Sequence, residues 1–180
     1  MEQLHGGYTL KLCEGAFPLS TDSMLLADFA RLPANARVLD LGSGCGTLGL
    51  LLCAKDPNCH VIGVEIDPNA HCTALDNSLE NGLASRLESI CADLTQISAL
   101  LPPGSFSCCI SNPPYFSGGP ASKTVPVARR DDLCSMDDLF RTAAWAVNMA
   151  AIFFWCTNQS DLRNYSPVRT TPDWSQNGFA

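Results

Sequence analysis

Short apolar segments alternate with helical segments through most of the chain, and this alternation restricts the possible folds more than any other feature of the sequence. The strand-like runs are RVLDL, CHVIGVEID, LESICADL, FSCCIS and IFFW, and apolar residues recur at helical spacing between them. Strands that alternate with helices form βαβ units, in which a parallel sheet is covered on both faces. We therefore predict a doubly wound α/β fold with a mostly parallel sheet.

Composition narrows the class of protein. The chain has 180 residues, of which 46% are hydrophobic and 16% charged, so one domain with a sizeable core is expected. The formal charge of −7 argues against a surface that binds nucleic acid all over, although a local basic patch is compatible with it. Because the N-terminus lacks a signal-peptide pattern and no apolar run is long enough to span a bilayer, we expect a cytoplasmic enzyme without membrane contact.

The ten cysteines include no C-x-x-C pair, and such a pair is the usual core of a structural zinc site. Several of them lie in apolar runs such as FSCCIS, where a reduced thiol behaves as a small hydrophobic side chain. The sequence therefore predicts buried thiols and no metal centre.

A glycine-rich loop, Asp40-Leu41-Gly42-Ser43-Gly44-Cys45-Gly46, directly follows the first predicted strand of the core. Glycines allow backbone N–H groups to approach a ligand closely, and Gly44, Gly46 and Gly49 also satisfy the weak pattern G-x-G-x-x-G. Because ligands of such sheets lie beyond the carboxyl ends of the strands, this loop is the predicted cofactor site.

Two further acidic residues follow strands in a way that fits a nucleoside. Glu65, followed by Ile66, ends the second core strand, where a carboxylate can accept from ribose hydroxyls. Asp93 and Leu94 follow the third strand, where they could contact an adenine. NAD and S-adenosylmethionine both contain these groups; Asp40 favours the second, since a carboxylate suits a methionyl amine better than a pyrophosphate.

The fourth core strand ends in Asn112-Pro113-Pro114-Tyr115. The prolines have no N–H, so this turn offers backbone carbonyls and the asparagine oxygen as acceptors. Such acceptors suit a planar amino group, either on a base or on a carboxamide, and Tyr115 offers a ring for stacking. We predict that this turn binds an amino nitrogen that attacks an electrophile directly, without a covalent enzyme intermediate.

LDLGSGCG, VEID, ADL and NPPY, in this order and spacing, resemble the class I S-adenosylmethionine-dependent methyltransferases that methylate amino nitrogens. The resemblance spans about residues 21–147, and TDSMLLADF together with the stretch from NPPYF to ARR-D is most similar to the bacterial tRNA(Val) adenine-N6 methyltransferase family. It implies a Rossmann-like fold, S-adenosylmethionine as cofactor and a tRNA substrate. By the same resemblance, the target is held by Asn112, Pro113, Pro114 and Tyr115, and the cofactor by Asp40, Gly42, Gly44, Gly46, Glu65, Ile66, Asp93, Leu94 and Asn112.

The substrate is left open by these motifs. NPPY alone does not separate adenine N6 from cytosine N4 or from glutamine N5 of a protein, although the short segment before the glycine loop makes a protein substrate less expected. Lys123, Arg129 and Arg130 could contact phosphates. A cofactor-binding fragment without activity is a further alternative, and an NAD-dependent oxidoreductase is the least favoured one.

The resemblance divides the chain into a substrate-side segment at 1–36, a methyltransferase core at 37–155 and an atypical tail at 156–180. The family's sheet has seven strands, and the tail shows neither strand alternation nor helical periodicity, so we expect the last two strands to be missing. Back-translation one nucleotide out of register gives family-like residues after Met149, and we therefore hypothesise a frameshift near Asn148. Loss of the closing strands would expose a sheet edge and could leave the chain inactive.

Overall fold

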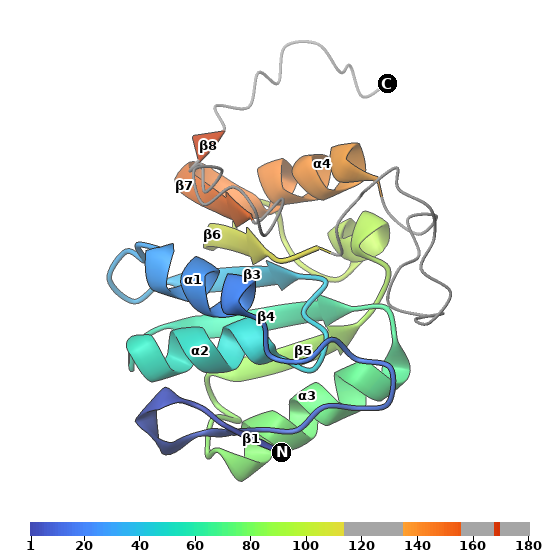
Figure 1. The fold of residues 1–180 in the computed structure, drawn as a ribbon. Helices are drawn as coiled ribbons and strands as arrows, with labels where there is room; N and C mark the ends of the chain where they lie inside the picture. The colour runs from blue at the N-terminus through green and yellow to red at the C-terminus, as the bar shows by residue number, and fades with distance from the viewer. Residues whose placement is uncertain (114–134, 156–167, 170–180) are drawn as a thin grey trace, which may run out of the picture.

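The computed structural model describes residues 1–113, 135–155 and 168–169 (Figure 1). An N-terminal hairpin and four helices surround a sheet of six strands in the order β5-β4-β3-β6-β7-β8. In chain order the elements are β1 (Glu2–Gln3), η1 (His5–Gly7), β2 (Thr9–Leu10), α1 (Thr21–Phe29), β3 (Arg37–Leu41), α2 (Thr47–Lys55), β4 (His60–Glu65), α3 (Pro68–Glu80), β5 (Leu87–Cys91), η2 (Leu94–Ala99), β6 (Phe106–Ser111), α4 (Met136–Ala146), β7 (Val147–Trp155) and β8 (Val168–Arg169).

The sheet confirms the predicted fold class. Strands β5, β4, β3, β6 and β7 are parallel to one another, and the chain passes from β3 outward to β5 before it returns to β6 on the other side of β3. This reversal of strand order creates the crevice in which open α/β sheets bind their ligands. In β6 and β3, Ile110 is the register partner of Asp40.

The tail holds one short strand that the sequence did not indicate. Val168 and Arg169 pair antiparallel with Phe153 and Ile152 of β7. A strand of two residues is too short to produce alternation in the sequence, so a pattern search cannot find it.

Alternate residues of β3 enter two separate cores, as the period of a strand requires. Val38 belongs to the cluster beneath α1 and α2, whereas Leu39 and Leu41 belong to the cluster beneath η2 and α4. In Figure 1, α1, α2 and α3 cover one face of the sheet, and α4 lies beside β7. Both faces of the central strands are therefore buried, which explains their nearly continuous apolar sequence.

Side chains fix the ends of the helix that precedes the core. Ser20 is the N-cap of α1, and its Oγ accepts a hydrogen bond from the backbone N–H of Ser23 at 3.1 Å. At the other end, Lys55 Nζ of α2 donates to the carbonyls of Ala27 and Ala30 at 2.9 and 2.8 Å. These contacts hold α1 in register along α2.

The N-terminal hairpin is attached to α3 by two asparagines. Asn81 Oδ1 accepts from the Thr9 N–H at 2.8 Å, and its Nδ2 donates to the Thr9 carbonyl at 2.8 Å. Asn77 makes the same pair of contacts with the backbone of Lys11, at 2.8 and 2.9 Å. Because i and i+4 lie on one helix face, the two amides pair with alternate residues of the extended N-terminal segment.

Within the ranges that the structure describes, none of the helices combines the length and the apolar character that a membrane span needs.

Candidate functional site

The glycine loop closes against the end of the neighbouring strand β4. The backbone N–H groups of Gly42 and Ser43 both donate to the carbonyl of Val64, at 2.9 and 3.1 Å. Gly46 is the N-cap of α2, and its φ of +81° lies in the left-handed region that glycine tolerates best. Gly49 lies where α2 crosses the sheet, and a Cβ there would come within 2.4 Å of the Leu87 side chain. Glycine is thus required at Gly46 for the turn of the loop and at Gly49 of α2 for close packing.

Glu65 connects the glycine loop with the start of α3. Its Oε2 accepts from the Gly44 N–H and its Oε1 from the Asp67 N–H, each at 2.8 Å. A carboxylate has about four acceptor sites, so these two bonds leave capacity for the hydroxyls of a ligand. The predicted role of Glu65 toward a ribose is compatible with this geometry.

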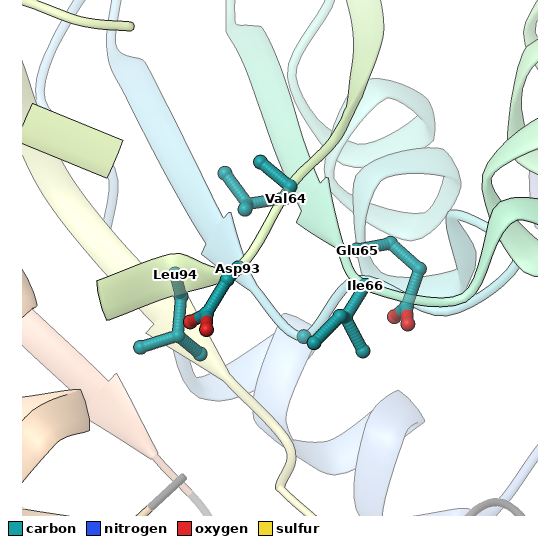
Figure 2. Close-up of a pocket in the computed structure, with 7 residues that line it drawn as sticks. Val64, Glu65, Ile66, Asp93 and Leu94 are labelled. Atoms are coloured by element: carbon teal, nitrogen blue, oxygen red, sulfur yellow. The ribbon is translucent and has the colours of Figure 1, made fainter. Parts of the chain in front are cut away.

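A pocket lies between the ends of β4 and β5 (Figure 2). Five of its lining residues belong to the set predicted from the sequence, and two were not foreseen; together they are Gly42, Val64, Glu65, Ile66, Ala92, Asp93 and Leu94. The volume is about 60 Å³, below the roughly 300 Å³ of a typical ligand pocket, so the pocket fits only part of a nucleoside.

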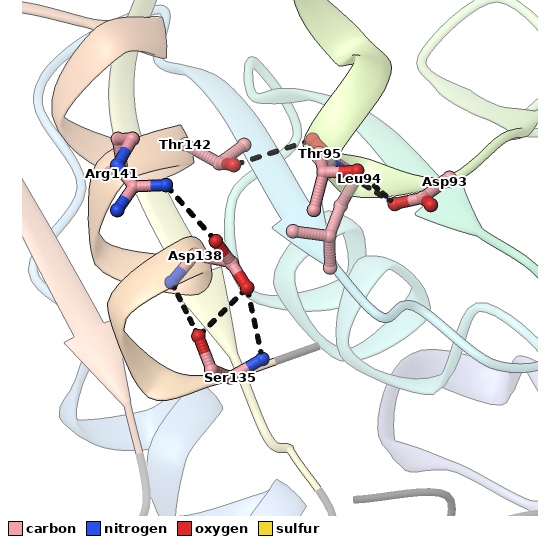
Figure 3. Close-up of polar contacts among 7 residues, drawn as sticks. All are labelled: Asp93, Leu94, Thr95, Ser135, Asp138, Arg141 and Thr142. Carbon is pink, nitrogen blue, oxygen red and sulfur yellow. Dashed lines mark hydrogen bonds and ion pairs between the residues drawn. The ribbon is translucent and has the colours of Figure 1, made fainter. Parts of the chain in front are cut away.

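Asp93 and Leu94 are held in place by short-range polar contacts (Figure 3). Asp93 Oδ1 caps η2 by accepting from the N–H and the hydroxyl of Thr95, at 2.8 and 2.7 Å. The Leu94 carbonyl accepts from Thr142 Oγ1 of α4 at 3.3 Å. The pocket wall is therefore connected to helix α4.

Asp40 is the most unusual acidic residue of the site. It is 1% exposed, and its Oδ1 has no hydrogen-bond partner among the described residues. Burial, with a smaller contribution from the nearby charge of Glu65, raises the pKa of Asp40 to about 8. A buried carboxyl oxygen without a partner is costly for the fold, and a cationic ligand group near Oδ1 would lower that cost. A Cβ on Gly42 or Gly44 would meet no described atom within 4 Å, so open space adjoins the loop beside Asp40.

Asn112 lies next to the glycine loop. Ser111 Oγ donates to the Leu41 carbonyl at 2.7 Å, and the next positions along β6 and β3 are Asn112 and Gly42. Asn112 Nδ2 donates to Ser23 Oγ of α1 at 2.9 Å. Pro113 follows as the last described residue of the turn, whereas Pro114, Tyr115, Lys123, Arg129 and Arg130 lie outside the described residues.

Two residues near the site were missed by sequence reasoning. Ser23 contacts Asn112 directly, and the buried Asn77 donates from Nδ2 to the carbonyl of Cys45 in the glycine loop at 2.9 Å. Each contact joins segments far apart in the chain, so no local pattern announces it. In the described part of the chain, no three His, Cys, Asp or Glu side chains are grouped as metal ligands would be.

The methyltransferase small domain family matches residues 19–129 of this sequence, and the chain belongs to that family. Membership agrees with the expected resemblance to the methyltransferases. The residues fit S-adenosylmethionine, since the buried Asp40 Oδ1 has no partner among the described residues, Glu65 has acceptor capacity beyond its bonds to Gly44 and Asp67, and open space adjoins Gly42 and Gly44.

Curated relatives include two proteins named tRNA1(Val) (adenine(37)-N6)-methyltransferase. The protein from Aliivibrio salmonicida is 32% identical over 147 residues, which are 77% of this chain and 61% of that protein. The protein from Mannheimia succiniciproducens is 33% identical over 132 residues, covering 72% and 54% of the two chains. This chain thus spans about half to three fifths of the length of these relatives.

Solved structures support the fold. A predicted O-methyltransferase from Agrobacterium tumefaciens superposes with a TM-score of 0.62 at 24% identity, over 78% of this chain and 62% of that chain. An S-adenosylmethionine-dependent methyltransferase from Thiobacillus denitrificans, solved with S-adenosyl-L-homocysteine, gives a TM-score of 0.56 at 17% identity, over 78% and 49% of the two chains. At these identities the likeness establishes the shared fold.

Proposed function

We propose that this chain transfers a methyl group from S-adenosylmethionine to the N6 amino group of an adenine in tRNA. The names of the curated relatives support the substrate, and the family supports the reaction. We further propose that the substrate is a valine tRNA and that the protein acts in a bacterial cytoplasm.

The observation that carries the proposal is that Asn112-Pro113 directly follows β6 at the sheet edge where Gly42 follows β3, since Ser111 Oγ donates to the Leu41 carbonyl at 2.7 Å. Asn112 Oδ1 and the Pro113 carbonyl are acceptors, and proline removes a competing backbone donor. An exocyclic amine has its lone pair delocalised into the base. Acceptors for its hydrogens favour a pyramidal nitrogen, whose lone pair can then attack.

In this proposal the remaining site residues bind and orient the cofactor. Asp40 pairs with the methionyl ammonium, Glu65 accepts from the ribose hydroxyls, and Asp93 with Leu94 contacts the adenine in the pocket of Figure 2. Bound S-adenosylmethionine supplies the electrophilic methyl group. The backbone of the glycine loop allows the ligand to approach closely beside Asn112.

The proposal also assigns roles to the segments of the chain and to the residues that follow Pro113. Residues 1–36 act on the substrate side, residues 37–155 form the catalytic core, and Tyr115 stacks on the target base. Lys123, Arg129 and Arg130 contact phosphates of the tRNA. The residues after about Asn148, which include the tail at 156–180, arise from a frameshift, and resequencing the source DNA tests this hypothesis independently of any activity.

The experiment is transfer of label from methyl-labelled S-adenosylmethionine to an unmodified valine tRNA transcript, followed by digestion to nucleosides. The expected product is N6-methyladenosine, and it should be lost when guanosine replaces adenosine 37, the position in the relatives' names. Label in a protein glutamine would favour the alternative substrate. Cofactor binding without transfer to RNA or protein would contradict the proposed activity and favour a cofactor-binding fragment.

A further inference from the structure

Helix α1 reaches the proposed reaction centre through one side chain. Ser23 Oγ accepts a hydrogen bond from Asn112 Nδ2 at 2.9 Å, although 89 positions separate the two residues in the chain. Ser23 is 7% exposed, so water competes little for this contact. The contact thus links the segment before the core with the turn that follows β6.

The Ser23 hydroxyl is itself held by the end of its helix. The Ser23 N–H donates to Ser20 Oγ at 3.1 Å, and the two hydroxyl oxygens are also 3.1 Å apart. Ser23 can therefore donate its proton to Ser20 while it accepts from Asn112. Farther along α1, Leu26 and Ala27 are buried in the core against α2, which fixes the position of the whole helix.

The consequence concerns which end of the Asn112 amide is available. An asparagine side chain has one donor end and one acceptor end, and rotation by 180° exchanges them. When Nδ2 is bound to Ser23, Oδ1 occupies the other branch of the amide. In the opposite orientation, the NH₂ group would face the amino group of the substrate, so that two donors would oppose each other.

We infer that Ser23 is a positioning residue, which fixes the Asn112 amide with Oδ1 available to the target amino group. This inference rests on the proposed function, because it gives Asn112 an acceptor role toward an amine. It assigns a task to the first turn of α1 that neither the family match nor the relatives' names provide.

The first test compares Ser23→Ala with Ser23→Thr, which retains the hydroxyl, and with Thr21→Ala, which removes an exposed hydroxyl from the same helix turn. Methyl transfer to the valine tRNA transcript is measured with each. We expect Ser23→Ala to lower kcat about tenfold with the KM for S-adenosylmethionine nearly unchanged. Ser23→Thr should recover most of the rate, and Thr21→Ala should match the wild type. If the wild type is active and Ser23→Ala retains the wild-type kcat, the role of Ser23 is contradicted and the proposed function is unaffected.

A double variant separates positioning from a general effect on the fold. If Ser23 acts through Asn112, adding Ser23→Ala to Asn112→Ala should cause little further loss, because the group to be positioned is already absent. A full additional tenfold loss would overturn the inference.

A spectroscopic measurement tests the contact without relying on turnover. The side-chain NH₂ signals of Asn112, assigned by their absence in Asn112→Ala, should shift and exchange faster with water in Ser23→Ala than in the wild type. Unchanged signals would contradict the contact. Wild-type protein that methylates no RNA or protein would instead contradict the proposed function, and with it the catalytic purpose of the contact.

Discussion

The carboxylate of Glu65 accepts a hydrogen bond from the backbone N–H of Gly44 at 2.8 Å, and this bond joins the ends of two adjacent strands into one site. The second oxygen of Glu65 binds the Asp67 N–H at the start of α3. One side chain therefore stabilises the glycine loop and also faces the pocket in which we place the cofactor. Its substitution should affect ligand binding more than the core of the fold.

We expect Glu65→Gln to weaken S-adenosylmethionine binding about 10- to 100-fold, because the variant loses the charge and can offer an oxygen to only one of the two N–H groups. Calorimetric titration of both proteins measures the change. Glu88→Gln, at an exposed position of the adjacent strand β5, is the matched control and should bind like the wild type. Equal affinities for Glu65→Gln and the wild type would remove Glu65 from the cofactor site.

Cofactor affinity should depend on pH through Asp40. Since the Asp40 pKa is raised to about 8 by burial and by Glu65, the carboxyl must lose a proton before it can pair with an ammonium group. Affinity should therefore rise from about pH 6 to about pH 8, and decline above that as the α-amino group of the ligand deprotonates. Calorimetry in buffers of different ionisation enthalpy measures the proton released on binding.

The control for this titration is Asp40→Asn, which has no titrating carboxyl. It should bind S-adenosylmethionine weakly, with no proton release from this site. Tight binding by Asp40→Asn with an unaltered pH profile would show that Asp40 does not pair with the ligand.

The stability of the ligand-free protein should fall as the pH rises, opposite to the change expected in cofactor affinity. The Asp40 pKa lies near 8 in the folded state and near 3.8 in the unfolded state, so the folded state retains the proton over this interval. The stabilisation from the protonated form is complete below pH 3.8 and is lost as the pH rises through about 8. The wild type should therefore lose stability between about pH 5 and about pH 8, whereas Asp40→Asn should not. The free energy of unfolding of the variant minus that of the wild type should be larger at about pH 8 than at about pH 5. Urea unfolding at both pH values measures the two differences, and equal differences would contradict the raised pKa.

Asn77 should be important for stability and for the shape of the glycine loop. Its buried amide makes three hydrogen bonds to backbone groups, two with Lys11 and one with Cys45. Asn77→Ala leaves these groups without partners, and we expect a loss of about 2–4 kcal/mol in the free energy of unfolding. Urea denaturation provides the measurement. Asn69→Ala, at an exposed position in the same helix, should cost much less, and a similar cost in both variants would refute the role of Asn77.

Sequence patterns were sufficient for the features that depend on local order. Asp40, Gly42, Glu65 and Asp93 each stand at the end of a predicted strand, and parallel strands bring their carboxyl ends to one edge. The structure brings Gly42, Glu65 and Asp93 to one pocket, with Asp40 buried beside the glycine loop. Periodicity and spacing alone could therefore predict that Gly42, Glu65 and Asp93 meet at one edge of the sheet.

Contacts between distant segments could not be predicted in this way. The bond from Asn112 to Ser23 and the pairing of Asn77 with Lys11 depend on how helices pack, which no local spacing encodes. The two-residue strand Val168–Arg169 is too short for any periodicity. The predictions for Pro114 and Tyr115 concern residues outside the described ranges and stay predictions.

The most direct test of the account is a comparison of wild type and Asn112→Ala in two parallel measurements, methyl transfer to the valine tRNA transcript and calorimetric binding of S-adenosylmethionine. Asn58→Ala, an exposed asparagine in the loop between α2 and β4, is the control and should behave as the wild type in both. We predict that Asn112→Ala lowers transfer at least about 100-fold while the Kd for the cofactor is nearly unchanged. Undiminished transfer in Asn112→Ala would contradict the central claim that this side chain holds the amino group that is methylated.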